Sequence, residues 1–260
     1  EMDITKEWRQ GITAYYVYDR ANGEGGVSIL GQGLNSNLAP YNGVYRFPLG
    51  ANAYKADIFW LGTHGNYNPE FTLGRWSLNG FFMANLGEVQ THQGDSYKKA
   101  ADIFGYAANV RAGYKYGQTA DDNVMVDLFY ATGDDDDLQD KKYSGVLTGN
   151  NWGSPGAIMI SHGAYLLYPH GNVVNRYVAA VNDLSNIGLG QIGGTVNISK
   201  SLIPNKMMAK IGAAAAQSVV EPNGGGKMIG TEINAMISYK PAVYMEVELH
   251  GAYSVSYTHL

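Results

Sequence analysis

The sequence contains no cysteine among its 260 residues. Disulfide bonds, thiol nucleophiles and cysteine-based zinc sites are therefore excluded. It also contains no run of about 18 consecutive apolar residues, which argues against transmembrane helices. No segment near Glu1 has the basic and apolar regions of a signal peptide, as expected of a mature secreted protein or of an internal fragment.

Charged residues are scarce, at 16% of the chain against about 25% in typical soluble domains. The net charge is −5, so the chain lacks the basic footprint of a nucleic-acid-binding protein, and we expect no nucleic-acid partner. Glycine and tyrosine are abundant, with 34 and 20 residues. Low charge combined with many glycines and tyrosines is typical of a barrel whose strands face lipid on one side and water on the other.

Residues 104–116 alternate strictly between two kinds of side chain. One parity is wholly apolar, with aromatic residues at both ends: Phe104, Tyr106, Ala108, Val110, Ala112, Tyr114 and Tyr116. The other parity is small, polar or basic: Gly105, Ala107, Asn109, Arg111, Gly113 and Lys115. A period of two predicts a β-strand with two different faces. Aromatic residues at both ends of an apolar stripe are typical of a transmembrane β-strand.

The same alternation recurs along most of the chain. It predicts further strands within residues 12–18, 54–60, 76–86, 124–130, 190–198, 207–215, 229–239 and 243–253. Short connections at 117–123, 203–206 and 240–242 fall on one side, whereas 19–52 and 134–188 are long, as in outer-membrane barrels. We therefore expect an all-β protein, an antiparallel transmembrane β-barrel. Because such barrels have even strand numbers, about nine visible strands indicate an incomplete part of a larger barrel.

The domain organisation follows from this pattern. Residues 1–254 are expected to form a single partial β-barrel domain. The last six residues, Val255–Leu260, resemble the translation of a sequencing adapter, so we expect a non-native tail there. The alternative is a natural continuation of the last strand, since Val255 and Tyr257 keep the alternation.

Four segments resemble strands of the alginate-export-type, porin-like family of outer-membrane barrels. They are Trp76–Glu88, Gly105–Lys115, Leu128–Asp136 and Gly230–Tyr239. The resemblance implies the C-terminal part of a barrel of roughly eighteen strands in the bacterial outer membrane. It also implies a passive channel for hydrophilic solutes, anionic polysaccharide among them, surrounded by outer-membrane lipid and lipopolysaccharide. The inward parity here carries both signs of charge, whereas alginate passage is associated with an arginine-rich lumen.

Polar residues of the inward parity are the candidates for selecting solutes, because charges that line a pore act on what passes through it. They are Asn109, Arg111, Lys115, Asp127, Lys206, Lys210, Glu232, Asn234, Glu246, Glu248 and His250. Arg111, Lys115 and Asp127 on neighbouring strands would create a transverse field. The acidic group on the last two strands would favour cations. The alternative for both groups is that they are ordinary solvated charges on the wall of the lumen.

The acidic run Asp134, Asp135, Asp136 and Asp137 opens the longest connection. It would bind divalent ions that bridge lipopolysaccharide, or help to fold the connection into the lumen as a constriction. The alternative is a solvated acidic loop. The aromatic residues Trp152, Tyr165 and Tyr168 of this connection would stack on sugar rings or pack within the loop.

No resident metal or cofactor is expected. Residues 188–193 match G-x-G-x-x-G by letter but lie within a predicted strand, so a dinucleotide site does not fit the context. The chain has no G-x-S-x-G nucleophile motif. We therefore expect a channel and not an enzyme. Two alternatives stay open, a soluble all-β binding protein and an outer-membrane barrel enzyme, and the oligomeric state is not determined by the sequence.

Overall fold

A computed structural model describes residues 2–20, 53–135, 138–147, 163–167, 186, 188–223 and 225–256. These residues form strands, turns and bends and no helix, so the all-β prediction is confirmed for them. Within the same ranges, nothing helical is long and apolar enough to cross a membrane.

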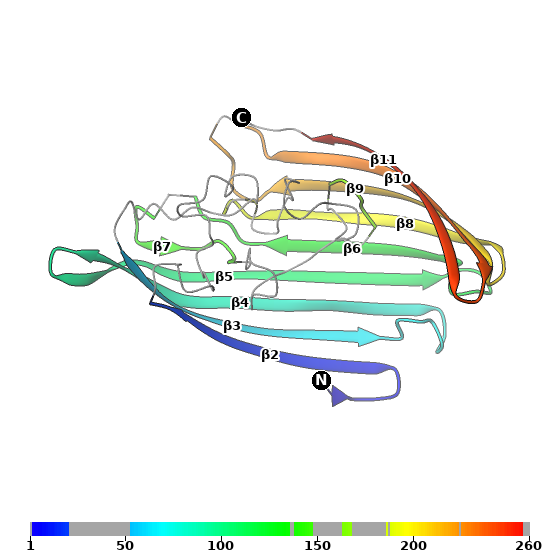
Figure 1. The fold of residues 1–260 in the computed structure, drawn as a ribbon, viewed down its shortest axis with the longest axis horizontal. Helices are drawn as coiled ribbons and strands as arrows, with labels where there is room; N and C mark the ends of the chain where they lie inside the picture. Colours follow the sequence, from blue (N-terminus) through cyan, green and yellow to red (C-terminus); the bar gives the residue numbers. More distant parts are fainter. Residues whose placement is uncertain are drawn as a thin grey trace.

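The strands lie side by side in one sheet (Figure 1). Their bounds are β1 Met2–Asp3, β2 Trp8–Asp19, β3 Tyr54–Tyr67, β4 Trp76–Gln93, β5 Ser96–Lys115, β6 Asn123–Ala131, β7 Lys142–Tyr143, β8 Gln191–Ile203, β9 Met207–Ser218, β10 Met228–Ala242 and β11 Met245–Ser256. Their order in the sheet follows the chain, except that β8 is the neighbour of β6. Every pairing is antiparallel apart from that of β7, which runs parallel to β5.

The nine longer strands correspond to the nine predicted from alternation. Two differences concern their ends. The chain remains extended through Ala242 and turns at Val243 and Tyr244, so the tight turn predicted at 240–242 lies slightly too early. The hairpin of β4 and β5 turns only at Gly94 and Asp95, well beyond the predicted strand ends.

The extra length of β4 and β5 was hidden by a change in their outward-facing residues. Between Phe104 and the hairpin turn the outward-facing side chains are charged. There, Lys99 Nζ lies 2.8 Å from Asp102 Oδ1 and 3.4 Å from Glu88 Oε2. The apolar stripe therefore ends while the strand pairing continues. A prediction that follows only the apolar stripe stops at the same point.

The two faces of the sheet differ in an unusual way. The face that we call the outer face is exposed and apolar, and includes Ile12, Phe82, Phe104, Val110, Leu128, Ile192, Val196, Ile211, Ile233 and Leu249. The opposite face, the inner face, buries polar side chains, which include Asn85, Asn109, Asp127, Thr195, Asn197, Glu232, Asn234 and Ser238. For residues 104–115 this is the division predicted from the sequence, with Phe104 57% exposed and Asn109 only 3% exposed.

Strand β3 departs from this division at its N-terminal half. Its apolar residues Tyr54, Ala56, Ile58 and Trp60 are buried on the inner face, and the intervening Lys55 and Asp57 occupy the outer side. The apolar parity of this strand therefore faces inward, not outward as in the other strands. The reason is a segment of the β6–β8 connection that packs on it, described below.

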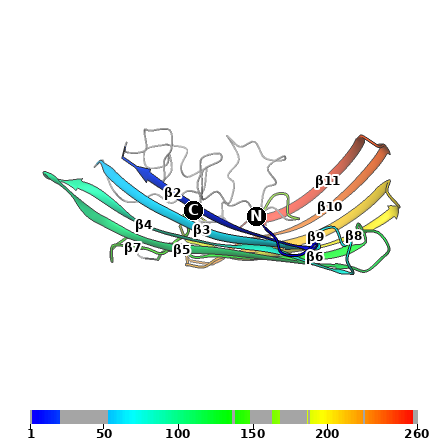
Figure 2. The same ribbon diagram turned by 90° about the horizontal axis from the view of Figure 1, so that it is seen from below.

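The sheet is open. Among the described residues, β1 and β11 lie at its two opposite edges and no pairing joins them. Figure 2 shows that the sheet is curved and twisted, not flat. Val255 and Ser256 continue β11 opposite Thr231 and Gly230, whereas residues 257–260 lie outside the described part.

The turn between β5 and β6 is tied to β8 by one carboxylate. Asp122 Oδ2 accepts hydrogen bonds from the backbone N and the Oγ1 of Thr119, at 3.1 and 3.0 Å. Its Oδ1 accepts one from the backbone N of Ser201 at 3.1 Å. These donors, that of the Thr119 backbone first, favour the ionised carboxylate and hold the pKa of Asp122 below its ordinary value.

We predict that Asp122→Asn lowers the urea midpoint of unfolding at pH 7. A carboxyl whose pKa is lowered by folding stabilises the fold above its unfolded pKa, and this stabilisation is lost as the pH falls through the folded pKa. The difference between variant and parent should therefore shrink below about pH 4. Urea titrations at a series of pH values test this, and a deficit that is the same at every pH would contradict it.

Candidate functional site

Residues 138–147, which we call the first inward segment, include β7, which pairs with the edge of β5, and then pass over the inner face towards β4 and β3. Tyr143 and Leu147 belong to one buried apolar cluster with Ile58, Trp60 and Ile103. Trp60 Nε1 donates a hydrogen bond of 3.0 Å to the carbonyl oxygen of Leu147. This packing explains why the apolar residues of β3 face inward.

The polar groups of this segment are also engaged with the sheet. The backbone N of Leu147 donates to Asn85 Oδ1 on β4 at 3.0 Å. β7 pairs with β5, so that Lys142 and Tyr143 lie opposite Asp102 and Ile103. The first inward segment is thus a built part of the inner face.

The acidic run at the start of the connection is described only in part. Asp134 is buried, and its Oδ1 accepts hydrogen bonds from the backbone N of Ser144 at 2.8 Å and from Ser144 Oγ at 3.1 Å. Asp135 is exposed, and Asp136 and Asp137 lie outside the described residues. Asp134 therefore helps to fold the connection back over the sheet.

Residues 163–167, the second inward segment, are held by β10. The carboxylate of Glu232, only 2% exposed, accepts hydrogen bonds from three consecutive backbone N–H groups. The donors are Tyr165 at 2.7 Å, Leu166 at 2.8 Å and Leu167 at 2.6 Å. Asn234 Nδ2 donates to Glu232 Oε1 at 2.9 Å and to the carbonyl oxygen of Gly163 at 2.7 Å.

Side chains of the second inward segment add further contacts. The Tyr165 ring lies edge-on to His250 of β11, with 4.9 Å between centroids, and Lys210 Nζ of β9 lies 5.2 Å from its centre. Ala164 and Leu167 are buried in a second apolar cluster. The partners of Ala164 and Leu167 there include Ala107, Phe129, Val146, Ala214 and Ala216. Tyr165 therefore packs against side chains of β9 and β11, whereas Trp152 and Tyr168 lie outside the described residues.

Of the predicted charged group on β5 and β6, the structure brings Arg111 and Asp127 together but not Lys115. Arg111 lies directly opposite Asp127 in the strand register. Asp127 is buried and accepts a hydrogen bond from Asn109 Nδ2. Lys115 Nζ donates instead to the carbonyl oxygen of Phe71, at 2.9 Å, in the turn between β3 and β4.

A recess of about 290 Å³ lies on the inner face, between that turn and the second inward segment. Its lining includes Phe71, Arg111, Asn197, Ser199, Met208 and Lys210. Two of these side chains are cationic, and no carboxylate contributes to the lining. Arg111 Nε and Asn197 Oδ1 are buried and have no hydrogen-bond partner among the described residues. The recess is therefore lined in part by polar side chains, two of which are cationic.

The remaining candidates lie away from this recess. Lys206 is exposed in the turn between β8 and β9. Glu246 accepts a hydrogen bond from Ser238 Oγ and lies 3.7 Å from Lys240 Nζ. Glu248 Oε2 lies 2.9 Å from His250 Nε2. These carboxylates face the same side as Glu232 but are much more exposed.

Sequence reasoning did not single out Asn197 and Ser199 as site residues. Alternation does place both residues on the inner face. Their role in the recess depends on which residues lie opposite them on the neighbouring strands β6 and β9. Ser199 lies opposite Lys210, and Asn197 lies opposite Met125. Only the strand register reveals those neighbours.

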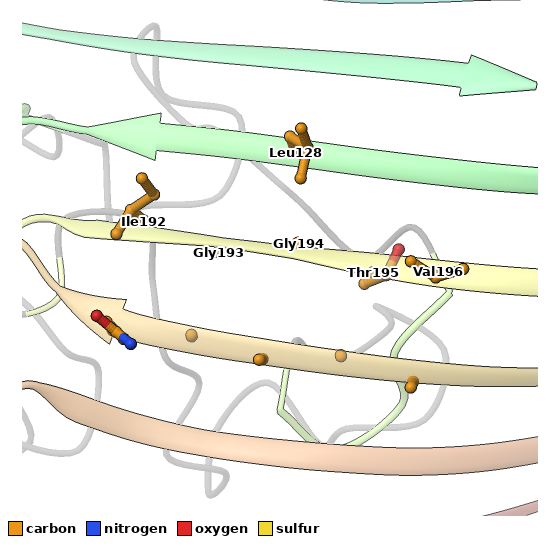
Figure 3. Close-up of a pocket in the computed structure, with 11 residues that line it drawn as sticks. Leu128, Ile192, Gly193, Gly194, Thr195 and Val196 are labelled. Carbon is orange, nitrogen blue, oxygen red and sulfur yellow. The ribbon is translucent and has the colours of Figure 1, made fainter.

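The outer face carries a shallow groove of about 560 Å³ over β6, β8 and β9 (Figure 3). Leu128, Ile192 and Val196 border it, and the small residues Gly194 and Ala213 form part of its floor. A Cβ at position 194 would lie 2.4 Å from the carbonyl oxygen of Asp127, so this strand approach requires glycine. The groove is apolar and continues the character of the outer face.

Comparison of the chain with known protein families and with curated proteins gives no match. Within the described ranges, no three His, Cys, Asp or Glu side chains are grouped so that they could hold a metal ion. The geometry of the sheet and its inner face is therefore the basis for any functional assignment.

We predict that Leu147→Ala loosens the first inward segment. Removing a buried leucine side chain costs about 2–5 kcal/mol, and here the loss falls on the apolar packing at one end of the segment. Trypsin should then cleave at Lys141 and Lys142 at least about tenfold faster than in the parent, in native conditions. Leu166→Ala is the matched control, because Leu166 is 51% exposed. Equal cleavage rates in the three proteins would contradict the packing described here.

Proposed function

We propose that the chain is part of an outer-membrane β-barrel that works as a diffusion channel for hydrophilic solutes. The observation that carries this proposal is the inversion of the two faces, with apolar side chains exposed and polar side chains covered. A soluble protein rarely exposes an apolar surface of this extent, because water penalises it. In a bilayer the same surface is stabilised by contact with lipid.

The height of the apolar band fits a bilayer. From Phe104 to Tyr114 on β5 there are ten residue steps of about 3.3 Å, or about 33 Å along the strand. In a strand tilted by about 35–45° this corresponds to a band about 25 Å tall, the height found in outer-membrane barrels. Aromatic pairs lie at both limits, Trp76 with Tyr114 and Phe104 with Tyr106.

The open edges of the sheet also belong to the proposal. In lipid, unpaired backbone groups along β2 and β11 would each cost several kcal/mol. We therefore propose that further strands pair with both edges and close a larger, even-stranded barrel. Outer-membrane lipid and lipopolysaccharide would then surround the outer face, and the inner face would line the pore.

The recess on the inner face suggests which solutes the pore admits. Arg111 and Lys210 line it and no carboxylate does, although Asp127 lies opposite Arg111 in the strand register. This arrangement suits hydrophilic solutes that carry negative charge, anionic polysaccharide among them, in line with the resemblance of four strands to alginate-export-type barrels. Transport would be passive, with selection by the charge and width of the pore.

If β5 spans a membrane, an added charge should destabilise the protein in the apolar band of the strand but not near its hairpin tip. Val110→Arg on the apolar band should lower the free energy of unfolding by about 2–4 kcal/mol in phospholipid vesicles. Ser96→Arg, near the hairpin tip of the same strand, should change it by less than about 0.5 kcal/mol. Urea unfolding after refolding into vesicles measures both. Equal and small effects would point to a water-soluble sheet.

The channel assignment predicts conductance. The complete protein, refolded in detergent and added to planar bilayers, should give stable single-channel steps. Arg111→Gln should shift the reversal potential in a salt gradient towards cation preference, because it removes a positive charge from the recess. Lys206→Gln removes the same charge from an exposed turn and should shift it less. A folded, heat-modifiable barrel without conductance would contradict the proposal.

A further inference from the structure

Glu232 is buried on the inner face and is satisfied by N–H groups from the chain itself. Three of its four donors are consecutive backbone amides of residues 165–167, and the fourth is the side chain of Asn234. Successive backbone N–H groups that converge on one point form an anion-binding concavity. Here the bound anion is a carboxylate of the sheet, and the concavity belongs to the segment that crosses the inner face.

We propose that Glu232 is a positioning residue that holds the second inward segment inside the pore, and so sets the width of the pore and not its charge selectivity. This inference rests on the proposed channel function. It assigns to one acidic wall residue a role that differs from those of the other carboxylates on the same face.

Glu232 and Asn234 bind backbone groups of the second inward segment and not its side chains. The amides of residues 165–167 and the carbonyl oxygen of Gly163 make the hydrogen bonds, so side-chain packing is a separate contribution. That contribution comes from Tyr165 against His250 and from Ala164 and Leu167 in the apolar cluster. Loss of the carboxylate would leave three N–H donors, two of them in buried hydrogen bonds, with a poorer acceptor, which is a heavy penalty for one loop segment.

Glu246 provides the matched control. Its side chain is 42% exposed, it lies on the neighbouring strand β11, and its partners are Ser238 and Lys240, none of which belongs to the second inward segment. Glu232→Gln and Glu246→Gln each remove one negative charge from the same face. Only the first replaces the carboxylate that accepts from the backbone of residues 165–167 with a weaker acceptor.

The first test measures pore width and selectivity separately, with the complete protein in planar bilayers. Glu232→Gln should raise the single-channel conductance about twofold or more and admit larger polyethylene glycols, since an inward segment is released. Glu246→Gln should leave both unchanged and move only the reversal potential. The proposal is overturned if Glu232→Gln shifts the reversal potential while conductance and polymer exclusion stay at parental values.

The second test does not need conductance. The chain has no cysteine, so Ala164→Cys introduces a single thiol at a position that is fully buried. A charged methanethiosulfonate reagent should label this thiol about tenfold faster or more when Glu232→Gln is added, because a buried hydrogen bond to a charged group is lost. Adding Glu246→Gln should leave the rate unchanged. Should Glu232→Gln fail to fold, Asn234→Ala removes the bond to Gly163 and should accelerate labelling in the same direction.

The two tests distinguish the failure of each idea. Faster labelling in a folded barrel without conductance would support the anchoring role of Glu232 and contradict the channel. Conductance with unchanged labelling would support the channel and overturn the anchoring role.

Discussion

The pleat of a β-strand sends successive side chains to opposite faces, and each feature of this protein depends on how the sequence uses that constraint. Apolar residues occupy one parity of most strands and polar or small residues the other. Because none of the described segments covers the outer face of the sheet, this arrangement leaves the apolar parity exposed. On the proposed membrane assignment, the hydrophobic effect favours contact of that face with lipid, and the polar parity would meet water and solutes.

The inner face is itself divided into two regions that are covered by different parts of one connection. Over β3 to β5 it is apolar and packs against Tyr143 and Leu147. Over β8 to β11 polar side chains bind the backbone of residues 163–167, beside the apolar contacts of Ala164 and Leu167. Both segments are therefore attached by burial of apolar surface together with hydrogen bonds. Apolar packing tolerates small shifts in position, whereas the hydrogen bonds define where the backbone lies.

Alternation was enough to predict the nine longer strands and the orientation of most of them, because strand period and face assignment are local properties of the chain. It was not enough for β3, whose apolar parity faces inward since it meets Leu147, 87 residues from Trp60 along the chain. The same holds for the candidate site. Glu232 could be placed on the inner face from its neighbours, but its bonds to residues 65–67 positions away could not be read from any spacing. Strand ends were misjudged where the outward side chains changed from apolar to charged.

The contrast between Glu232 and Arg111 shows why burial of a charge does not by itself identify a residue that acts on solutes. Both residues belong to the inner face. Glu232 has its two oxygens occupied by four N–H donors, so its charge is already compensated by fixed dipoles of the chain. Arg111 retains a buried Nε without a hydrogen-bond partner among the described residues, and it lines an open recess beside Lys210. On the proposed channel function, a passing anion would meet the charge of Arg111, which also lies opposite Asp127, whereas the charge of Glu232 is already compensated by the chain. The charged residues of the inner face would then divide into those that position chain segments and those that meet solutes.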